Sequence, residues 1–153
     1  MDKTGQLLKT KESRKNLAVD GLLFGLVSGI AMAVILLAFA LISGEAPATL
    51  LARFGTGNST SPLQGLLSHL AVSATYGLLF GTVFWPLLKR QSSPKWFAWL
   101  GGIVYAVLLL LLSQFVLLPS ANSPLLQIPF WEWAFGHILY GLVLGYLFAR
   151  NVG

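Results

Sequence analysis

The chain has 153 residues, of which 56% are hydrophobic and only 10% charged, and its mean hydropathy is +0.75. A soluble domain carries charge on roughly a quarter to a third of its surface, so this composition excludes the water-soluble class and indicates an integral membrane protein. The lack of cysteine excludes disulfides and thiolate metal sites, and because the net charge of +5 lies beside apolar spans, we expect anionic lipid headgroups and not nucleic acid as its partner.

Residues 1–16 form a basic segment ahead of the first apolar run. We expect this N-terminal segment to lie in the cytoplasm as a loosely ordered or interfacial stretch, because it has too few apolar side chains to build a core. The apolar run that follows, residues 21–43, is longer than the roughly 7–15 residues at the centre of a secretory signal. The first span is therefore expected to stay in the mature protein.

Four apolar segments are each long enough to cross a bilayer. At about 1.5 Å per residue, a helix needs about 20 residues to cross a hydrocarbon core of about 30 Å. Serine followed by proline, at Ser61-Pro62 and Ser93-Pro94, supplies a capping hydroxyl and a first-turn proline where the second and third segments begin. The sequence thus predicts an all-α membrane protein, a four-transmembrane-helix bundle that forms one domain over residues 17–150. The predicted spans are residues 17–42, 62–88, 94–118 and 129–149.

The distribution of lysine and arginine predicts the orientation of these spans. Five of the ten lie in residues 1–16, three in residues 89–95 and one at Arg150, whereas the other two loops hold only Arg53. Positive residues are enriched in the cytoplasmic loops of membrane proteins. We therefore expect a multi-pass protein of the cytoplasmic (inner) membrane, N-in/C-in, with both termini cytoplasmic.

A weak internal repeat links the second and fourth spans. Residues 76–81 read Tyr-Gly-Leu-Leu-Phe-Gly, and residues 140–145 read Tyr-Gly-Leu-Val-Leu-Gly. The first and third spans share only a glycine followed by an aromatic residue three positions later. This pattern predicts a tandem repeat of two helical hairpins, parallel to each other because both begin on the same side of the membrane.

Glycines recur at helical spacing in three of the spans. In lipid, small residues let helix backbones approach and gain van der Waals contact, so we predict that these glycines mark helix-packing faces. Two interpretations stay open: packing within the chain, or docking of a partner subunit on the stripe of the first span. The predicted helix-packing residues are Gly21, Gly25 and Gly29 in the first span, Gly77 and Gly81 in the second, and Gly141 and Gly145 in the fourth.

Both histidines of the chain, His69 and His137, fall inside predicted spans, where ionisable residues are usually functional. Each follows the proline that begins its helix by seven or eight residues, so we expect the two imidazoles at similar depth on the outer side of the bilayer. One interpretation is a pair of neutral rings that hydrogen-bond to serine, tyrosine or a backbone carbonyl and tie helices together. The alternative is a cofactor site in which His69 and His137 both ligate haem b.

The sequence contains none of the common catalytic signatures, such as G-x-S-x-G, a phosphate-binding glycine loop or H-E-x-x-H. We therefore predict no enzyme activity, no catalytic residue, no metal site and no cofactor. The first hypothesis is a non-catalytic accessory or scaffold subunit of a larger membrane complex, with membrane lipids and either a protein subunit or a second copy of the chain as partners. The alternatives are a haem b electron-transfer protein, and a small-solute permease or lipid-binding module.

Residues 136–145 read Gly-His-Ile-Leu-Tyr-Gly-Leu-Val-Leu-Gly, and they follow His69 in the second span and the pair Leu118-Pro119 after the third. With these features the chain resembles an uncharacterised family of small four-span prokaryotic membrane proteins, whose last helix tends to read Gly-His-x-x-Tyr-Gly-x-x-x-Gly. The resemblance covers residues 21–150. It implies the four-span fold and a prokaryotic source, and it implies no activity.

Overall fold

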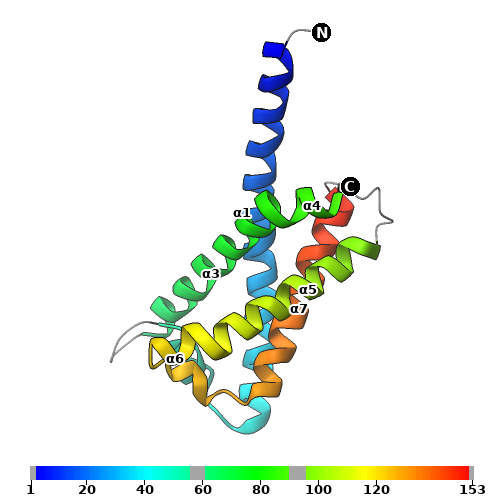
Figure 1. The fold of residues 1–153 in the computed structure, drawn as a ribbon. Helices are drawn as coiled ribbons and strands as arrows, with labels where there is room; N and C mark the ends of the chain where they lie inside the picture. Colours follow the sequence, from blue (N-terminus) through cyan, green and yellow to red (C-terminus); the bar gives the residue numbers. More distant parts are fainter. Residues whose placement is uncertain (1–2, 56–60, 90–95, 152–153) are drawn as a thin grey trace.

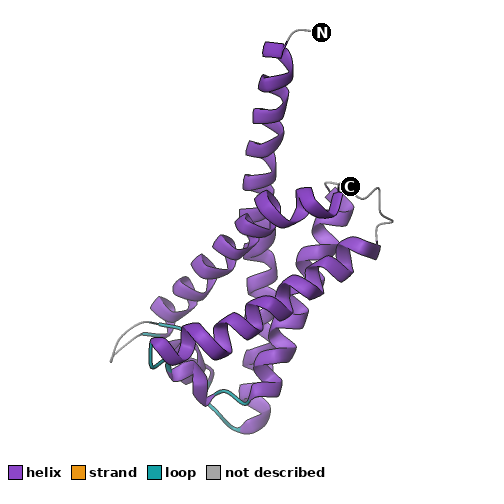
Figure 2. Ribbon diagram, in the orientation of Figure 1, coloured by secondary structure: helices purple, strands orange, loops and turns teal. Residues whose placement is uncertain are grey.

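The computed structural model describes residues 3–55, 61–89 and 96–151, and within these ranges the chain consists of helices and short loops (Figure 2). Four helical segments are long and apolar enough to cross a membrane, and they pack as a bundle (Figure 1). The predicted all-α, four-span class is therefore confirmed. The four segments are Asn16–Ser43, Pro62–Leu88, Trp96–Ser120 and Phe130–Asn151.

The first helix, α1 (Lys3–Ser43), begins well before the predicted first span. The segment that we expected to be loosely ordered is helical and continuous with the span, because lysine, leucine, glutamate and arginine favour helix and no proline interrupts them. α1 ends at Gly44, whose φ of 81° lies in the left-handed region. The amide of Glu45 then donates to the carbonyl of Ala40 at 2.8 Å, which satisfies the last turn before the short helix α2 (Pro47–Arg53).

The second span consists of α3 (Pro62–Leu79), a π-helical turn η1 (Phe80–Phe84) and α4 (Trp85–Lys89). Its start has the predicted cap, because the hydroxyl of Ser61 accepts a hydrogen bond from the amide of Gln64 at 3.2 Å. One of the amides that the first helical turn leaves without a helical partner is satisfied in this way.

The third span consists of α5 (Trp96–Leu112), a second π-helical turn η2 (Ser113–Leu117) and the short α6 (Leu118–Ser120). A single 3₁₀ turn, η3 (Pro124–Gln127), leads into the fourth span, α7 (Phe130–Asn151). The third and fourth spans are therefore joined without a long loop.

Each π-helical turn ends two residues before a proline, Pro86 in one span and Pro119 in the other. In each, the amide of the residue just before the proline donates to the carbonyl five positions earlier. A proline inside a helix has no N–H to donate, and its ring clashes with the carbonyl four positions earlier. The wider π turn relieves that clash, so the two helices continue past their prolines, to Lys89 and Ser120.

The spans pack as a series of neighbouring pairs. α1 packs against α3 and α7, and α5 packs against α7, whereas α3 and α5 are not a closely packed pair among the described residues. The start of α1 and the end of α7 lie at one end of the bundle, and α6 lies at the other (Figure 1). We call these the terminal end and the loop end. The first turns of α1 project beyond the other helices at the terminal end (Figure 1).

The α1–α3 and α5–α7 pairs make equivalent contacts through glycine. A Cβ at Gly21 would lie 2.5 Å from the carbonyl oxygen of Gly77. A Cβ at Gly102 would meet the carbonyl oxygen of Gly141 in the same way. Such approach distances leave no room for a side chain, so each hairpin is held by direct contact between two helix backbones.

A second pair of contacts repeats the match one helical turn further along. A Cβ at Gly81 would lie 2.5 Å from the carbonyl oxygen of Leu17, and one at Gly145 would lie 2.5 Å from that of Ala98. A shift of 81 positions thus relates α1 to α5, and a shift of 64 positions relates α3 to α7. These equivalent contacts support the expected tandem repeat of helical hairpins.

Candidate functional site

A cavity of about 310 Å³ lies between α3, α5 and α7 near the loop end of the bundle. Its walls are mainly apolar and aromatic, and Met32 of α1 and Phe54, which follows α2, complete them. None of the described residues that line it is Asp, Glu, Lys or Arg. Both His69 and His137 line this cavity, so the structure brings the two histidines of the sequence to one site.

His69 connects α3 to α1. Its side chain is buried, and its Nε2 lies 3.0 Å from the carbonyl oxygen of Gly29. A carbonyl oxygen only accepts hydrogen bonds, so Nε2 is the protonated nitrogen of the neutral ring and Nδ1 is the unprotonated one. The ring of Phe54 packs against the imidazole, with the ring centroids 4.5 Å apart.

His137 is held by its own helix. Its Nδ1 donates to the carbonyl oxygen of Trp133, one turn earlier, at 2.9 Å, which leaves Nε2 as the unprotonated nitrogen. The ring of Trp133 packs against the imidazole with a centroid distance of 4.7 Å. The indole N–H of Trp133 donates to Ser113 Oγ at 3.2 Å, and Ser113 donates to the carbonyl of Leu110 at 2.9 Å. This series of hydrogen bonds fixes the position of α5 relative to α7 beside the cavity.

The second nitrogen of each imidazole has no hydrogen-bond partner among the described residues. These atoms are Nδ1 of His69 and Nε2 of His137. Neither nitrogen is fully enclosed by protein, so each keeps some exposed surface. Because both rings line the cavity, each unprotonated nitrogen is accessible to a molecule that occupies it.

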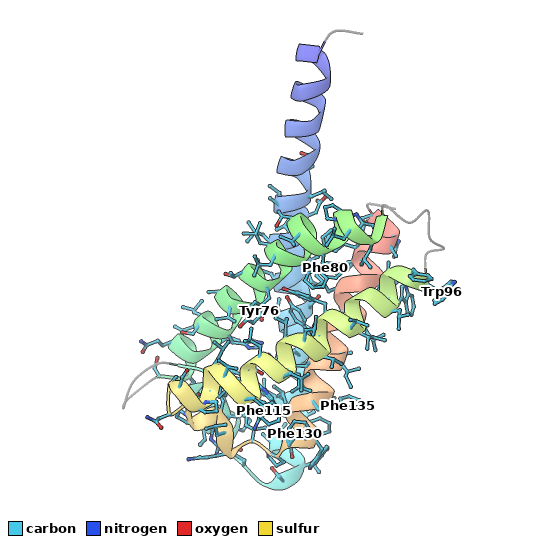
Figure 3. The ribbon with its side chains drawn as sticks, in the orientation of Figure 1. Tyr76, Phe80, Trp96, Phe115, Phe130 and Phe135 are labelled. Carbon is cyan, nitrogen blue, oxygen red and sulfur yellow. The ribbon has the colours of Figure 1, made fainter. Side chains whose placement is uncertain are left out.

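Two tyrosine hydroxyls tie the helices together on the terminal-end side of the histidines. Tyr140 of α7 donates to the carbonyl oxygen of Ser73 in α3, and Tyr105 of α5 donates to that of Tyr76, both at 2.8 Å. Figure 3 shows Tyr76 midway along the second span. These bonds join both helices of the second hairpin to α3 and close the cavity on this side.

The two seams between the hairpins, α1–α7 and α3–α5, are equivalent by the repeat. Toward the terminal end, aromatic pairs close both of them. Phe24 and Phe148 meet with centroids 5.1 Å apart in the first seam, and Tyr105 and Phe84, at the equivalent positions, meet at 4.7 Å in the second. The repeat is therefore well preserved in this half of the bundle.

Toward the loop end the seams differ, and one position accounts for much of the difference. Gly136 of α7 lies against Met32 and Leu36 of α1, whose atoms would be 3.3–3.4 Å from a Cβ there. The equivalent residue of α3 is Val72, which is 50% exposed and lines the cavity. Glycine lets α1 approach α7, whereas valine occupies space that α5 would need to approach α3.

Aromatic residues hold only one of the two seams closed at the loop end. Phe39 of α1 packs edge-on against Trp131 and Phe135 of α7, at 5.0 and 5.7 Å between centroids. Figure 3 shows Phe135 on this last helix. Among the described residues the α3–α5 seam has no such contact, and two exposed residues that line the cavity, Val72 and Leu117, lie on α3 and η2. The equivalent residues there are Ser120, Leu67 and Ala71, none of them aromatic.

The predicted helix-packing glycines all lie at contacts within the chain. Gly25 faces the carbonyl oxygen of Ser73, where a Cβ would lie 2.5 Å away, and Gly29 faces the Ser73 side chain. The glycine stripe of the first span is therefore covered by α3. It is the closeness of this contact that lets His69 of α3 reach the backbone of α1 at Gly29.

Of the aromatic residues beside the two histidines, the sequence indicates Trp133 by its spacing and does not indicate Phe54. Trp133 lies one turn before His137 on the same helix face, so its spacing is a signal that was present in the sequence. Phe54 lies in the segment after α2, and no periodicity indicates that it would reach His69. Its position depends on the fold of the loop end.

An ion pair holds α2 against the end of α1. Both guanidinium nitrogens of Arg53 contact the carboxylate of Glu45, at 2.7 and 3.1 Å. Two parallel contacts of this kind fix geometry better than a single one. Arg53 is the basic residue predicted on the outer side, and it is already paired.

In the part of the chain that the structure describes, no group of three or more His, Cys, Asp or Glu residues is placed to hold a metal ion. No family model, curated protein or solved structure matches the chain.

Proposed function

We propose that this integral membrane protein is non-catalytic and binds a small amphipathic molecule from the lipid phase in the cavity between α3, α5 and α7. The observation that carries the proposal is a cavity lined by both histidines that lies beside α3 and α5, two helices that are not closely packed against each other. Small-molecule sites are mostly apolar, contain a few placed polar groups and measure about 300–1,000 Å³. The cavity has this character and lies at the lower end of that range.

Binding is better supported than passage of a solute across the membrane. The aromatic pairs at Phe24–Phe148 and Phe84–Tyr105 close both seams between the cavity and the terminal end. A permease needs a path that reaches both sides. A site with one lateral opening fits a lipid-binding module instead.

We also propose how the bundle is oriented and which membrane contains it. Nine of the ten lysine and arginine residues belong to segments that we expect on the cytoplasmic side, so we place the terminal end in the cytoplasm. The cavity then lies in the outer half of the bilayer. The resemblance of the last helix to prokaryotic four-span proteins adds the inner membrane of a prokaryote to this proposal.

Filling the cavity tests the binding function directly. Val72→Trp places a large ring at the opening, and Val104→Trp is the matched control, because Val104 is also 50% exposed but does not line the cavity. Both variants are purified from membranes in mild detergent, and native mass spectrometry then measures retained small molecules. We expect wild type and Val104→Trp to retain an additional mass that Val72→Trp has lost. Equal retention by all three proteins contradicts the proposal.

The accessory or scaffold role is a second proposal, and the shape of α1 supports it. The first turns of α1 project beyond the other helices (Figure 1), and this stretch of the sequence is basic, which suits contact with a partner subunit or anionic headgroups. Native gel migration in mild detergent tests this role. Migration as a lone monomer under every mild condition removes its support.

Haem b is the alternative cofactor proposal, and the meeting of His69 and His137 at one cavity favours it. The present hydrogen bonds oppose it, because His69 would ligate iron through Nδ1 or first release Gly29. Arg53, the basic residue expected for the propionates, is bound to Glu45. A reduced-minus-oxidised spectrum of protein purified without chelator decides the matter, and a flat spectrum eliminates haem.

A further inference from the structure

We infer that the cavity selects a lipid alcohol, a neutral amphipathic molecule whose hydroxyl headgroup donates a hydrogen bond to the imidazole of His69 or of His137. The inference rests on the proposed binding function and names the class of molecule that the site takes. It depends on which atoms at the cavity are still able to donate a proton and which are able only to accept one.

The two imidazoles present acceptors to the cavity. In each ring, the nitrogen that donates to the carbonyl oxygen of Gly29 or Trp133 carries the proton, and the other ring nitrogen carries none. Turning either neutral ring into a donor toward the cavity means breaking its bond to that carbonyl. His69 Nδ1 and His137 Nε2 therefore act as acceptors only.

Two nearby hydroxyls already donate hydrogen bonds to carbonyl oxygens of the protein. Tyr140 donates to the carbonyl of Ser73, and Ser113 donates to that of Leu110. Each keeps lone pairs, and Ser113 already uses one to accept from Trp133. Four more residues with hydroxyls line the cavity, and none of these hydroxyls donates to a described residue, so they accommodate either kind of group; they are Ser68, Ser73, Tyr76 and Ser123.

The charge of the headgroup follows from the rest of the lining. No described lining residue is Asp, Glu, Lys or Arg, so an ammonium or phosphate placed there has no ionic partner. A buried charge without a partner is strongly disfavoured. A neutral hydroxyl supplies the missing donor without that penalty, and the open α3–α5 seam leaves its apolar chain in contact with lipid.

Molecules that can only accept hydrogen bonds are expected to bind poorly. An ether, ester or ketone headgroup leaves the imidazole nitrogens unpaired, and an unpaired buried polar group weakens binding by about tenfold or more. The comparison between an alcohol and its methyl ether isolates this effect, because the two molecules have nearly the same chain and size.

The test uses the full chain in lipid nanodiscs and two probes, dodecanol with a terminal trifluoromethyl group and the methyl ether of the same molecule. Fluorine NMR titrations measure the binding of each probe. We expect wild type to bind the alcohol about tenfold or more tightly than the ether. His137→Phe is expected to weaken alcohol binding toward that of the ether while ether binding changes little.

The outcomes separate this inference from the proposed function. If wild type binds both probes equally and Val72→Trp displaces both, the binding function holds and the alcohol selectivity is overturned. If neither probe binds at a site sensitive to Val72→Trp, the proposed function itself fails. The comparison of the two probes on wild type decides the selectivity even if His137→Phe does not fold.

Discussion

Single glycine positions set the distance between the helices. At Gly141 the backbone of α7 comes so close to α5 that a methyl group would overlap the carbonyl oxygen of Gly102. At Gly136, on the same helix, a methyl group would lie 3.3 Å from the Met32 side chain, which is flexible. The same substitution therefore has a different effect at each site.

We predict that Gly141→Ala destabilises the bundle by about 1–3 kcal/mol, whereas Gly136→Ala has a much smaller effect. The reason is that a carbonyl oxygen of a helix backbone is unable to move aside, whereas a methionine side chain is able to. Reversible unfolding in mixed detergent micelles measures both. Equal stability of the two variants would contradict the backbone contact at Gly102.

A second residue-scale prediction concerns the hydroxyl of Tyr140. Tyr140→Phe removes the 2.8 Å bond to the carbonyl of Ser73, which is already part of a helix and so is not left unsatisfied. We expect a loss of about 1 kcal/mol. Tyr146→Phe is the matched control, because the Tyr146 hydroxyl is on the exposed surface, where it accepts from Arg150. The same unfolding assay should show no change for the control.

At the scale of helices, the cavity comes from the difference between two equivalent seams. Both are closed by aromatic pairs near the terminal end, and only the α1–α7 seam is closed near the loop end. Gly136 in the closed seam and Val72 in the open one occupy equivalent positions. The opening is therefore a property of α3 that a small change of sequence is able to alter.

We predict that Val72→Gly lets α5 move closer to α3 and narrows the opening. The chain has no cysteine, so spin labels on introduced cysteines at Leu67 and Leu112, both exposed, report this distance without interference. The interspin distance should shorten relative to the same labels on the wild-type background. An unchanged distance would show that Val72 does not hold the seam open.

At the scale of the whole molecule, we predict that the loop end faces outward. Ala121→Cys, in the turn after α6, should react with a membrane-impermeant maleimide added to intact cells. Asn151→Cys, at the end of α7, should react only after the cells are opened. The reverse labelling pattern would overturn the proposed orientation.

The four spans could be predicted from the sequence, whereas little of the candidate site could be. Membrane-spanning helices follow from the composition of long windows, and the cap at Ser61 follows from a local pattern. The cavity depends on a mismatch between Gly136 and Val72, which becomes visible only once the hairpin contacts fix the alignment of the repeat. The tautomer of His69 depends on Gly29, forty positions away in the chain. The basic N-terminal segment is helical and not loosely ordered, because its residues favour helix and continue the first span.

The two seams between the hairpins differ in what they contribute to the molecule. The α1–α7 seam holds the bundle together, so a change at Gly136 or Phe39 acts first on stability. The α3–α5 seam contributes less to holding the bundle, so we expect a change at Val72 to act first on binding at the proposed site. If the proposed binding function holds, the ligand of such a protein could change while its framework stays the same.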